Sequence, residues 1–194
     1  MPHLHQPNGP LNPFYDGSTP VAGYSAAPGE AMTAGTGITT GTGTVYQAWI
    51  NEEGPLTKTT IFVDLTGLNS SAAGDIIGVQ ATANCHFGQY NFEINGDPVR
   101  GRLTCVEVPA TGEPDIDVIA ADEATGTEDA AYSGLTNDAA LVAPGADFAA
   151  VGQSYEFTAM PGDNQYLYLS GSGGGTDATY TAGQFLIELW GIKR

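Results

Sequence analysis

The ten residues TKTTIFVDLT, positions 57–66, alternate between polar and apolar side chains. Ile61, Val63 and Leu65 fall on one face, while the positions between them are polar apart from one phenylalanine. A period of two residues is typical of a β-strand with one face against a core. This stretch therefore predicts a half-buried strand.

The same alternation recurs along most of the chain, punctuated by Gly, Pro, Asn and Asp, and no stretch has a convincing helical period. Strands without intervening helices favour a sandwich or a barrel. We predict an all-β fold for residues 44–194, an antiparallel β-sandwich of the jelly-roll type. The further predicted strands lie at 45–50, 89–95, 99–108, 115–121, 154–159, 166–169 and 184–192.

The stretch QYNFEIN, positions 89–95, alternates most regularly and leads into the turn signature Asn95-Gly-Asp-Pro98. Asn and Gly tolerate positive φ, so a hairpin with residues 99–108 as the partner strand is predicted. Cys85 and Cys105 would then lie on neighbouring strands. Without a CxxC spacing, we expect both thiols to be reduced and buried.

The first forty-three residues contain no lysine or arginine and hold half of the chain's 12 prolines. Such a segment buries too little apolar surface to offset its ordering entropy alone. It nevertheless carries spaced apolar side chains. We predict an extended N-terminal arm, residues 1–43, that contacts a neighbouring protein through Phe14, Tyr15 and Tyr24.

The charge of the chain is lopsided, with 22 acidic against 5 basic residues and a formal net charge of −17. Binding to the nucleic-acid backbone or to an anionic membrane needs clustered cations, so neither partner is expected. The sequence begins without a basic region followed by an apolar one, and no apolar run is long enough to span a bilayer. We expect a protein made in a cytosol.

Chemistry-bearing residues are sparse. Asp115 and Asp117 are predicted on the exposed face of their strand, and Glu188 at the rim of the last one, so no pair of glycosidase carboxylates is expected. The Asp115-x-Asp117 spacing does not continue into a calcium loop. His3 and His5 lack a third metal ligand, and a structural role is expected for His86. No catalytic residue, cofactor or metal is predicted.

Residues 122–152 are long for a loop in a compact domain, and two interpretations stay open. The first is a contact loop that packs on a neighbouring subunit, with Tyr132 and Leu135 as contact residues beside Leu141 and Val142. The second is an irregular edge strand with a surface loop.

The last third of the chain resembles the ending of small virion proteins of marine tailed phages. The likeness is carried by Gln165-Tyr-Leu-Tyr-Leu169, a Gly-rich loop and the run from Asp177 to Gly191, and the segments 115–118 and 58–65 are similar to the same group. This resemblance implies a β-sandwich capsid decoration or cement protein without enzymatic activity. The family offers no catalytic residues to transfer.

Two functions are therefore carried forward. The first is a virion protein that decorates and stabilises the outer surface of a phage capsid, binds the major capsid protein and associates with itself, for which a homotrimer would suit the three-fold positions of a shell. The alternative is a carbohydrate- or receptor-binding module of a phage fibre that uses Tyr46, Trp49 and Trp190.

Overall fold

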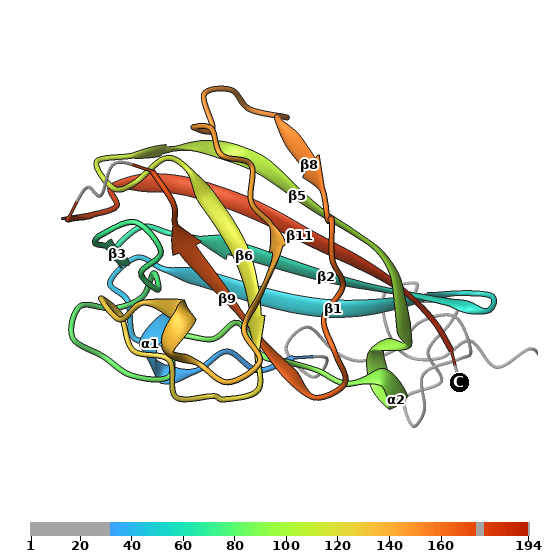
Figure 1. The fold of residues 1–194 in the computed structure, drawn as a ribbon. Coiled ribbons are helices and arrows are strands. Elements are labelled where there is room, and N and C mark those ends of the chain that lie inside the picture. Colours follow the sequence, from blue (N-terminus) through green and yellow to red (C-terminus); the bar gives the residue numbers. More distant parts are fainter. Residues whose placement is uncertain (1–31, 174–176, 194) are drawn as a thin grey trace, which may run out of the picture.

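The computed structural model describes residues 32–173 and 177–193. It consists of two antiparallel sheets packed face to face, one with the order β1-β2-β11-β5-β8 and the other with the order β4-β9-β6-β7 (Figure 1). A small ladder joins β10 to β3. The strands are β1 (Val45–Glu53), β2 (Leu56–Asp64), β3 (Asn69–Ser70), β4 (Gln89–Tyr90), β5 (Asp97–Ala110), β6 (Ile116–Ala121), β7 (Ala139–Val142), β8 (Ser154–Glu156), β9 (Gln165–Gly171), β10 (Ala178–Thr179) and β11 (Ala182–Ile192).

The order of the strands is that of a jelly roll. From β2 onward the chain crosses repeatedly from one sheet to the other. As a result, β2, β5, β8 and β11 form one sheet and β4, β6, β7 and β9 form the other. The last strand, β11, lies between β2 and β5, and β1 extends the first sheet at its edge. The predicted all-β fold, an antiparallel sandwich, is confirmed.

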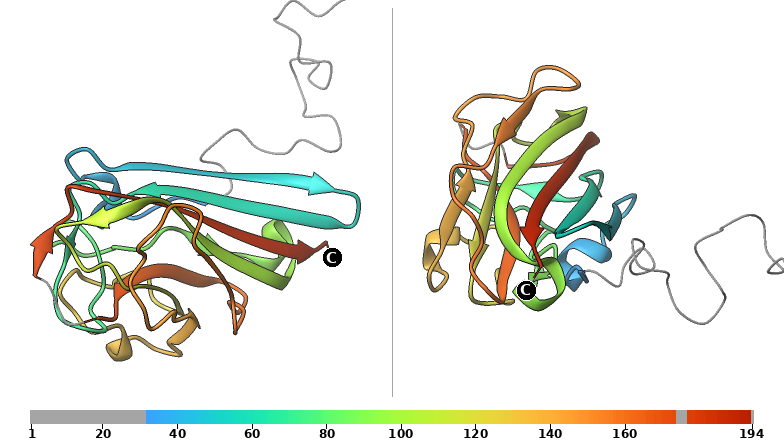
Figure 2. Two further views of the ribbon diagram at one scale, coloured as in Figure 1. Left: turned by 90° about the horizontal axis from the view of Figure 1, so that it is seen from above. Right: turned by 90° about the vertical axis from the view of Figure 1, so that its right-hand side faces the viewer.

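The core lies between the two sheets, and β11 shows how the alternation builds it. Phe185, Ile187 and Leu189 point inward and are fully buried, while the residues between them point away from the core. Strand β6 differs because all six of its residues are buried. The β1–β2 hairpin extends beyond the second sheet, as two views show (Figures 1 and 2).

From the sequence, residues 32–43 are predicted to belong to the N-terminal arm. In the structure they pack against the sandwich. Met32 and Ile38 are buried, the latter in the short helix α1 (Thr36–Thr39). The Gly37 amide donates to Asn84 O at 3.1 Å, and a Cβ at Gly37 would lie 2.4 Å from Cys85 Sγ. Such a close approach requires glycine. The predicted contact residues Phe14, Tyr15 and Tyr24 lie outside the described residues.

The predicted hairpin around Asn95 is wrong, because β4 and β5 belong to opposite sheets. After Tyr90 the chain forms the helical turn α2 (Phe92–Asn95), capped by the Asn91 side chain, which accepts from two backbone amides. The buried Asn95 side chain donates to Thr59 Oγ1 at 2.9 Å. Local capping therefore overrides the alternation and carries the chain from one sheet to the other.

The two cysteines are also placed differently from the expectation. Cys85 lies in the connection before β4 and Cys105 lies on β5, in the other sheet, so they are not on neighbouring strands. Both thiols are free and buried, as predicted. Burial raises the pKa of the Cys85 thiol to about 12. Within the described residues, no helix has the length and apolarity needed to cross a membrane.

Candidate functional site

The outward face of the five-stranded sheet carries an unusual group of side chains around Trp190. In the strand register Trp190 lies opposite Lys58 of β2 and Arg100 of β5, and Glu188 lies opposite Arg102. Side chains at opposite positions of an antiparallel pair are in contact range. We call this group the Trp190 cluster; it comprises Lys58, Arg100, Arg102, Glu156, Glu188 and Trp190.

Three cations surround the indole ring. The Lys58 ammonium lies 5.2 Å from the ring centroid, and the guanidinium carbons of Arg100 and Arg102 lie at 4.8 and 5.8 Å. These distances are in the range of cation–π attraction. Trp190 itself is half-buried, so part of the ring remains accessible. The arrangement fixes the orientation of both the ring and the charges.

Glu188 lies beneath these cations and is only 3% exposed. It pairs with Lys58 through one carboxylate oxygen and with Arg102 through the other. Burial alone raises the pKa of this carboxyl, but the hydrogen bonds and charges of Lys58 and Arg102 outweigh it and lower the pKa. The prediction that Glu188 faces the rim is therefore wrong, because its long neighbours cover it.

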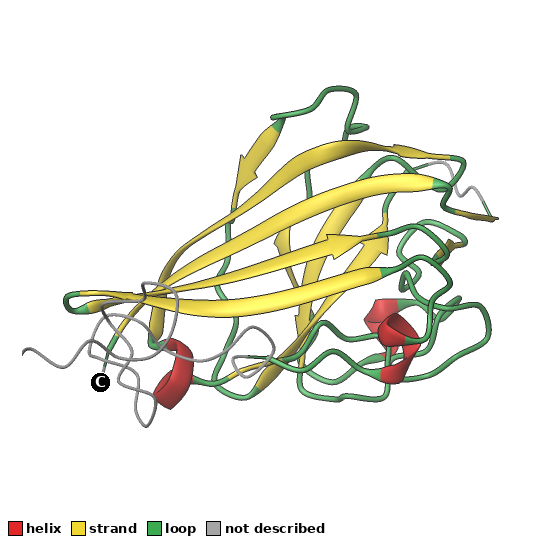
Figure 3. Cartoon of the chain, turned by 180° about the vertical axis from the view of Figure 1, so that it is seen from behind, coloured by secondary structure: helices red, strands yellow, loops and turns green. Residues whose placement is uncertain are grey.

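The outer part of the cluster is open to solvent. Arg100 donates to both carboxylate oxygens of Glu156, at 2.8 and 2.7 Å, and the two side chains are each 53% exposed. Viewed from behind, the outer face of this sheet is crossed by no described helix or strand (Figure 3). A planar guanidinium and an indole ring are side chains on which binding energy commonly concentrates in interfaces.

The cluster concentrates the positive charge of the described chain. Three of its four described basic residues belong to the cluster, and the fourth, Lys193, pairs with Glu52 at 2.5 Å. Three cations and two carboxylates give a local charge of +1, on a chain whose net charge is −17. The Trp190 cluster thus differs in sign from the protein as a whole.

The aromatic residues named for sugar binding do not form one surface. Tyr46 is turned toward the core, and its hydroxyl donates to Phe87 O at 2.5 Å and to Met32 O at 3.2 Å. Burial raises the pKa of this phenol. Trp49 points outward between the buried Ala48 and Ile50, but strand β2 separates it from Trp190. Tyr46 therefore cannot join the two tryptophans in a binding platform.

A second group of polar residues is buried at one end of the four-stranded sheet. Asp115 and Asp117 are 5% and 4% exposed, so the prediction that they lie on an exposed face is wrong. The reason is that β6 is covered on both faces. Burial raises the pKa of Asp117 to about 6, Ser172 opposes this with a hydrogen bond of 3.2 Å, and the charge of Asp115 adds to it.

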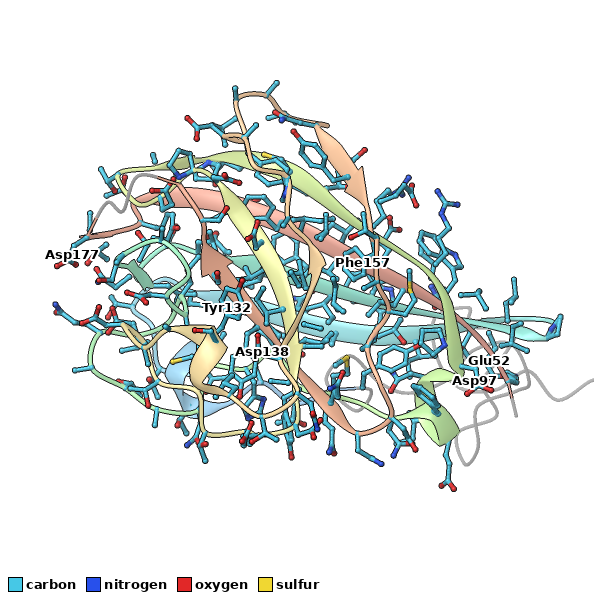
Figure 4. The ribbon with its side chains drawn as sticks, in the orientation of Figure 1. Glu52, Asp97, Tyr132, Asp138, Phe157 and Asp177 are labelled. Carbon is cyan, nitrogen blue, oxygen red and sulfur yellow. The ribbon has the colours of Figure 1, made fainter. Side chains whose placement is uncertain are left out.

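A hollow of about 520 Å³ lies near the end of the same sheet. At its floor, the buried Glu128 carboxylate accepts from Asn69 Nδ2 at 2.9 Å and from the Ala81 amide at 2.8 Å. Asp177, labelled in Figure 4, lies at its rim. These hydrogen bonds join the β3 segment to two connecting segments, which gives the buried carboxylate a structural role.

The predicted contact residues Tyr132 and Leu135 are half-buried and pack against the core of their own domain. Tyr132 begins the short 3-10 helix η1 (Tyr132–Gly134), whose position Figure 4 shows. Leu141 and Val142 are buried in β7 and belong to the core. Much of the long 122–152 connection therefore packs on the sandwich itself.

The histidine expected to be structural has an aromatic environment. The His86 ring lies 4.8 Å from Tyr166 and 6.2 Å from Tyr168, between ring centroids, and burial lowers its pKa. His3 and His5 lie outside the described residues. In the described part of the chain, no three His, Cys, Asp or Glu side chains converge as ligands of one metal ion.

Comparison with known proteins gives no relative: no family model, curated protein or solved structure matches the chain.

The Trp190 cluster was missed by sequence reasoning, although part of its signal is present. Alternation alone puts Lys58 and Trp190 on outward positions, but only the register of β2, β11 and β5 brings them together.

Proposed function

We propose that this protein is a non-enzymatic virion structural protein that decorates and stabilises the outer surface of a phage capsid. The observation that carries the proposal is the Trp190 cluster, a rigid aromatic and cationic group on the outward face of a jelly-roll sheet. Jelly rolls are a recurrent architecture of capsid proteins. The resemblance of the C-terminal third to phage virion proteins points in the same direction.

In this proposal the outward face of the five-stranded sheet contacts the major capsid protein. Docking would bury the accessible part of Trp190 and the exposed Arg100, the two residue types that most often dominate interface energetics. Each bound copy would bridge a joint between capsid subunits, and binding only to the assembled shell stabilises that shell by mass action. The arm contacts neighbouring subunits, and self-association gives a homotrimer at three-fold positions.

The test is a binding assay with undecorated shells. Trp190→Ala should reduce shell occupancy at least tenfold, whereas Val151→Ala, which trims an exposed apolar residue in the connection before β8 and outside the Trp190 cluster, should bind like the wild type. Equal occupancy by both variants would contradict docking through the Trp190 cluster.

The arm is tested separately with a deletion that spares the packed segment. Removing residues 1–31 leaves Met32 and Ile38 in place. Reduced shell binding or loss of the trimer in analytical ultracentrifugation is the expected result. Unchanged binding and unchanged mass would remove the arm from the proposal.

Carbohydrate binding is the second candidate, and the accessible Trp190 ring beside three cations favours it for an anionic sugar. If the protein binds carbohydrate, a glycan array should show reproducible binding, and Trp190→Ala should abolish it. Trp49→Ala is the companion variant, because Trp49 lies on the same outward face. Binding to shells without any glycan signal would reject this candidate.

A further inference from the structure

Four oxygen-bearing side chains share one face where β6 and β9 meet. Asp117 lies directly opposite Ser170 in the antiparallel ladder, and the Ser172 amide donates to Asp115 O at 2.9 Å one step further along. Residues opposite each other, and residues two apart in a strand, point to the same side of a sheet. Asp115, Asp117, Ser170 and Ser172 therefore form one group, which we call the β6–β9 oxygen group.

Within residues 32–173 and 177–193, two atoms of this group have no hydrogen-bond partner. They are Asp115 Oδ1 and Ser170 Oγ, and both are buried. Ser170 is fully buried, and it lies opposite Asp117 in the ladder. A buried polar atom without a partner costs about 1–3 kcal/mol, so its presence in a folded domain calls for an explanation.

Among the described basic residues, none supplies this group with a compensating positive charge. Lys58, Arg100 and Arg102 are held in the Trp190 cluster on the other sheet, and Lys193 pairs with Glu52. Glu113 adds a further carboxylate nearby, with Oε1 3.3 Å from the Asp115 amide that donates to it. Two buried carboxylates with no cation are unfavourable unless a proton or a bound ion neutralises them.

We propose that the β6–β9 oxygen group binds one calcium ion, with the carboxylates of Asp115 and Asp117 and the hydroxyl of Ser170 as protein ligands. All three donors are oxygens, which suits a hard cation and not zinc, whose sites use His and Cys. Calcium accepts mixed sets of carboxylate, carbonyl and water oxygens with flexible geometry, whereas magnesium demands an octahedron and retains its waters. Because only two of the proposed ligands are carboxylates, neutral oxygens would fill the remaining coordination positions of the calcium ion.

This inference goes beyond the proposed capsid role and does not depend on it. A bound calcium ion would neutralise the two carboxylates, and it would be coordinated by both oxygens that lack a hydrogen-bond partner. It would also tie β6 to β9 at the end where the Gly-rich connection begins, since Ser172 immediately follows β9. Its consequence is a fold whose stability depends on the free calcium concentration.

The experiment uses the full chain, stripped with a chelator, and calcium chloride as the probe. Calorimetric titration should give one site per chain, and the melting temperature should rise by about 5–10 °C at a hundredfold excess over Kd. Asp117→Asn should abolish both effects. This variant should fold well without calcium, because it removes a buried charge, so a missing calcium response cannot be attributed to unfolding.

Two further variants separate this site from other acidic surfaces. Ser170→Ala should weaken calcium binding several-fold, whereas Asp129→Asn, at the nearby hollow, should leave it unchanged. The proposal is overturned if the wild type shows no calcium heat and no shift in melting temperature. It is equally overturned if Asp117→Asn responds like the wild type, or if only Asp129→Asn loses the response, which would assign calcium to the hollow.

Discussion

Glu188 on β11 and Asp117 on β6 are two carboxylates with almost the same burial, 3% and 4% exposed, and opposite electrostatics. Burial acts to raise the pKa of both carboxyls. Lys58 and Arg102 reverse the effect at Glu188, so that its pKa is lowered, whereas the pKa of Asp117 rises to about 6. Burial alone therefore does not decide the charge of an acid; the partner across the strand does.

The difference follows from how each sheet covers its outer face. The five-stranded sheet covers Glu188 with long cationic side chains, which are themselves in contact with solvent. The four-stranded sheet buries β6 on both sides, and none of the described basic residues pairs with Asp117. The first site is complete within the chain, and the second needs a proton or an ion.

The largest expected effect comes from removing a cation over Glu188. Arg102→Met should lower the free energy of unfolding by about 3–4 kcal/mol, because it leaves a buried carboxylate with Lys58 alone. Chemical denaturation in urea measures this loss. Adding Glu188→Gln to Arg102→Met should restore a large part of it, and no restoration would mean that Arg102 acts through packing only.

A smaller effect, with the opposite dependence on pH, is expected at Asp117 in calcium-free protein. Its pKa of about 6 exceeds the ordinary 3.8, so its contribution to stability is lost as pH rises from about 4 through 6. Two pKa units correspond to about 2–3 kcal/mol. Glu188, with its lowered pKa, contributes stability at neutral pH that is lost in acid.

The measurement is the difference in unfolding free energy between wild type and Asp117→Asn, followed from pH 4 to pH 8. The gap should widen in favour of the variant as pH rises, since the asparagine cannot ionise. If the difference in unfolding free energy stays constant from pH 4 to pH 8, the raised pKa of Asp117 is contradicted.

Removing a buried hydroxyl compares the two sheets at a finer scale. Ser170→Ala and Thr104→Val each delete a buried oxygen that has no partner among the described residues, one on β9 and one on β5, so each should raise calcium-free stability by about 1 kcal/mol, the low end of the cost of such an atom. Only Ser170→Ala should lose part of the stabilisation by calcium in thermal melts. Equal calcium responses of the two variants would argue against Ser170 as a ligand.

The smallest effect is expected for the exposed pair of the Trp190 cluster. Arg100→Ala should leave the urea midpoint unchanged within error, because exposed ion pairs contribute little to stability. It should nevertheless weaken shell binding, which a pull-down of shells measures. A clear loss of stability would show that the pair is more than a surface contact.

The fold was largely readable from the sequence because a sandwich core needs only alternation. Ile187 and Leu189 are buried where the period of two places them. The environments of Asp117 and Glu188 were not readable, because alternation assigns a face to a residue but not what covers that face. Arg102 reaches Glu188 from a strand 86 residues away in sequence. The QYNFEIN stretch failed for a local reason, the Asn91 cap.

The central claim, that two equally buried carboxylates differ because only one has its cations, is tested most directly by measuring both pKa values in one sample. Carbon-13 NMR of the side-chain carboxyls, in calcium-free protein, should place Asp117 near 6 and Glu188 below the ordinary 4.5. If the two carboxyls titrate together in the ordinary range, the claim is contradicted.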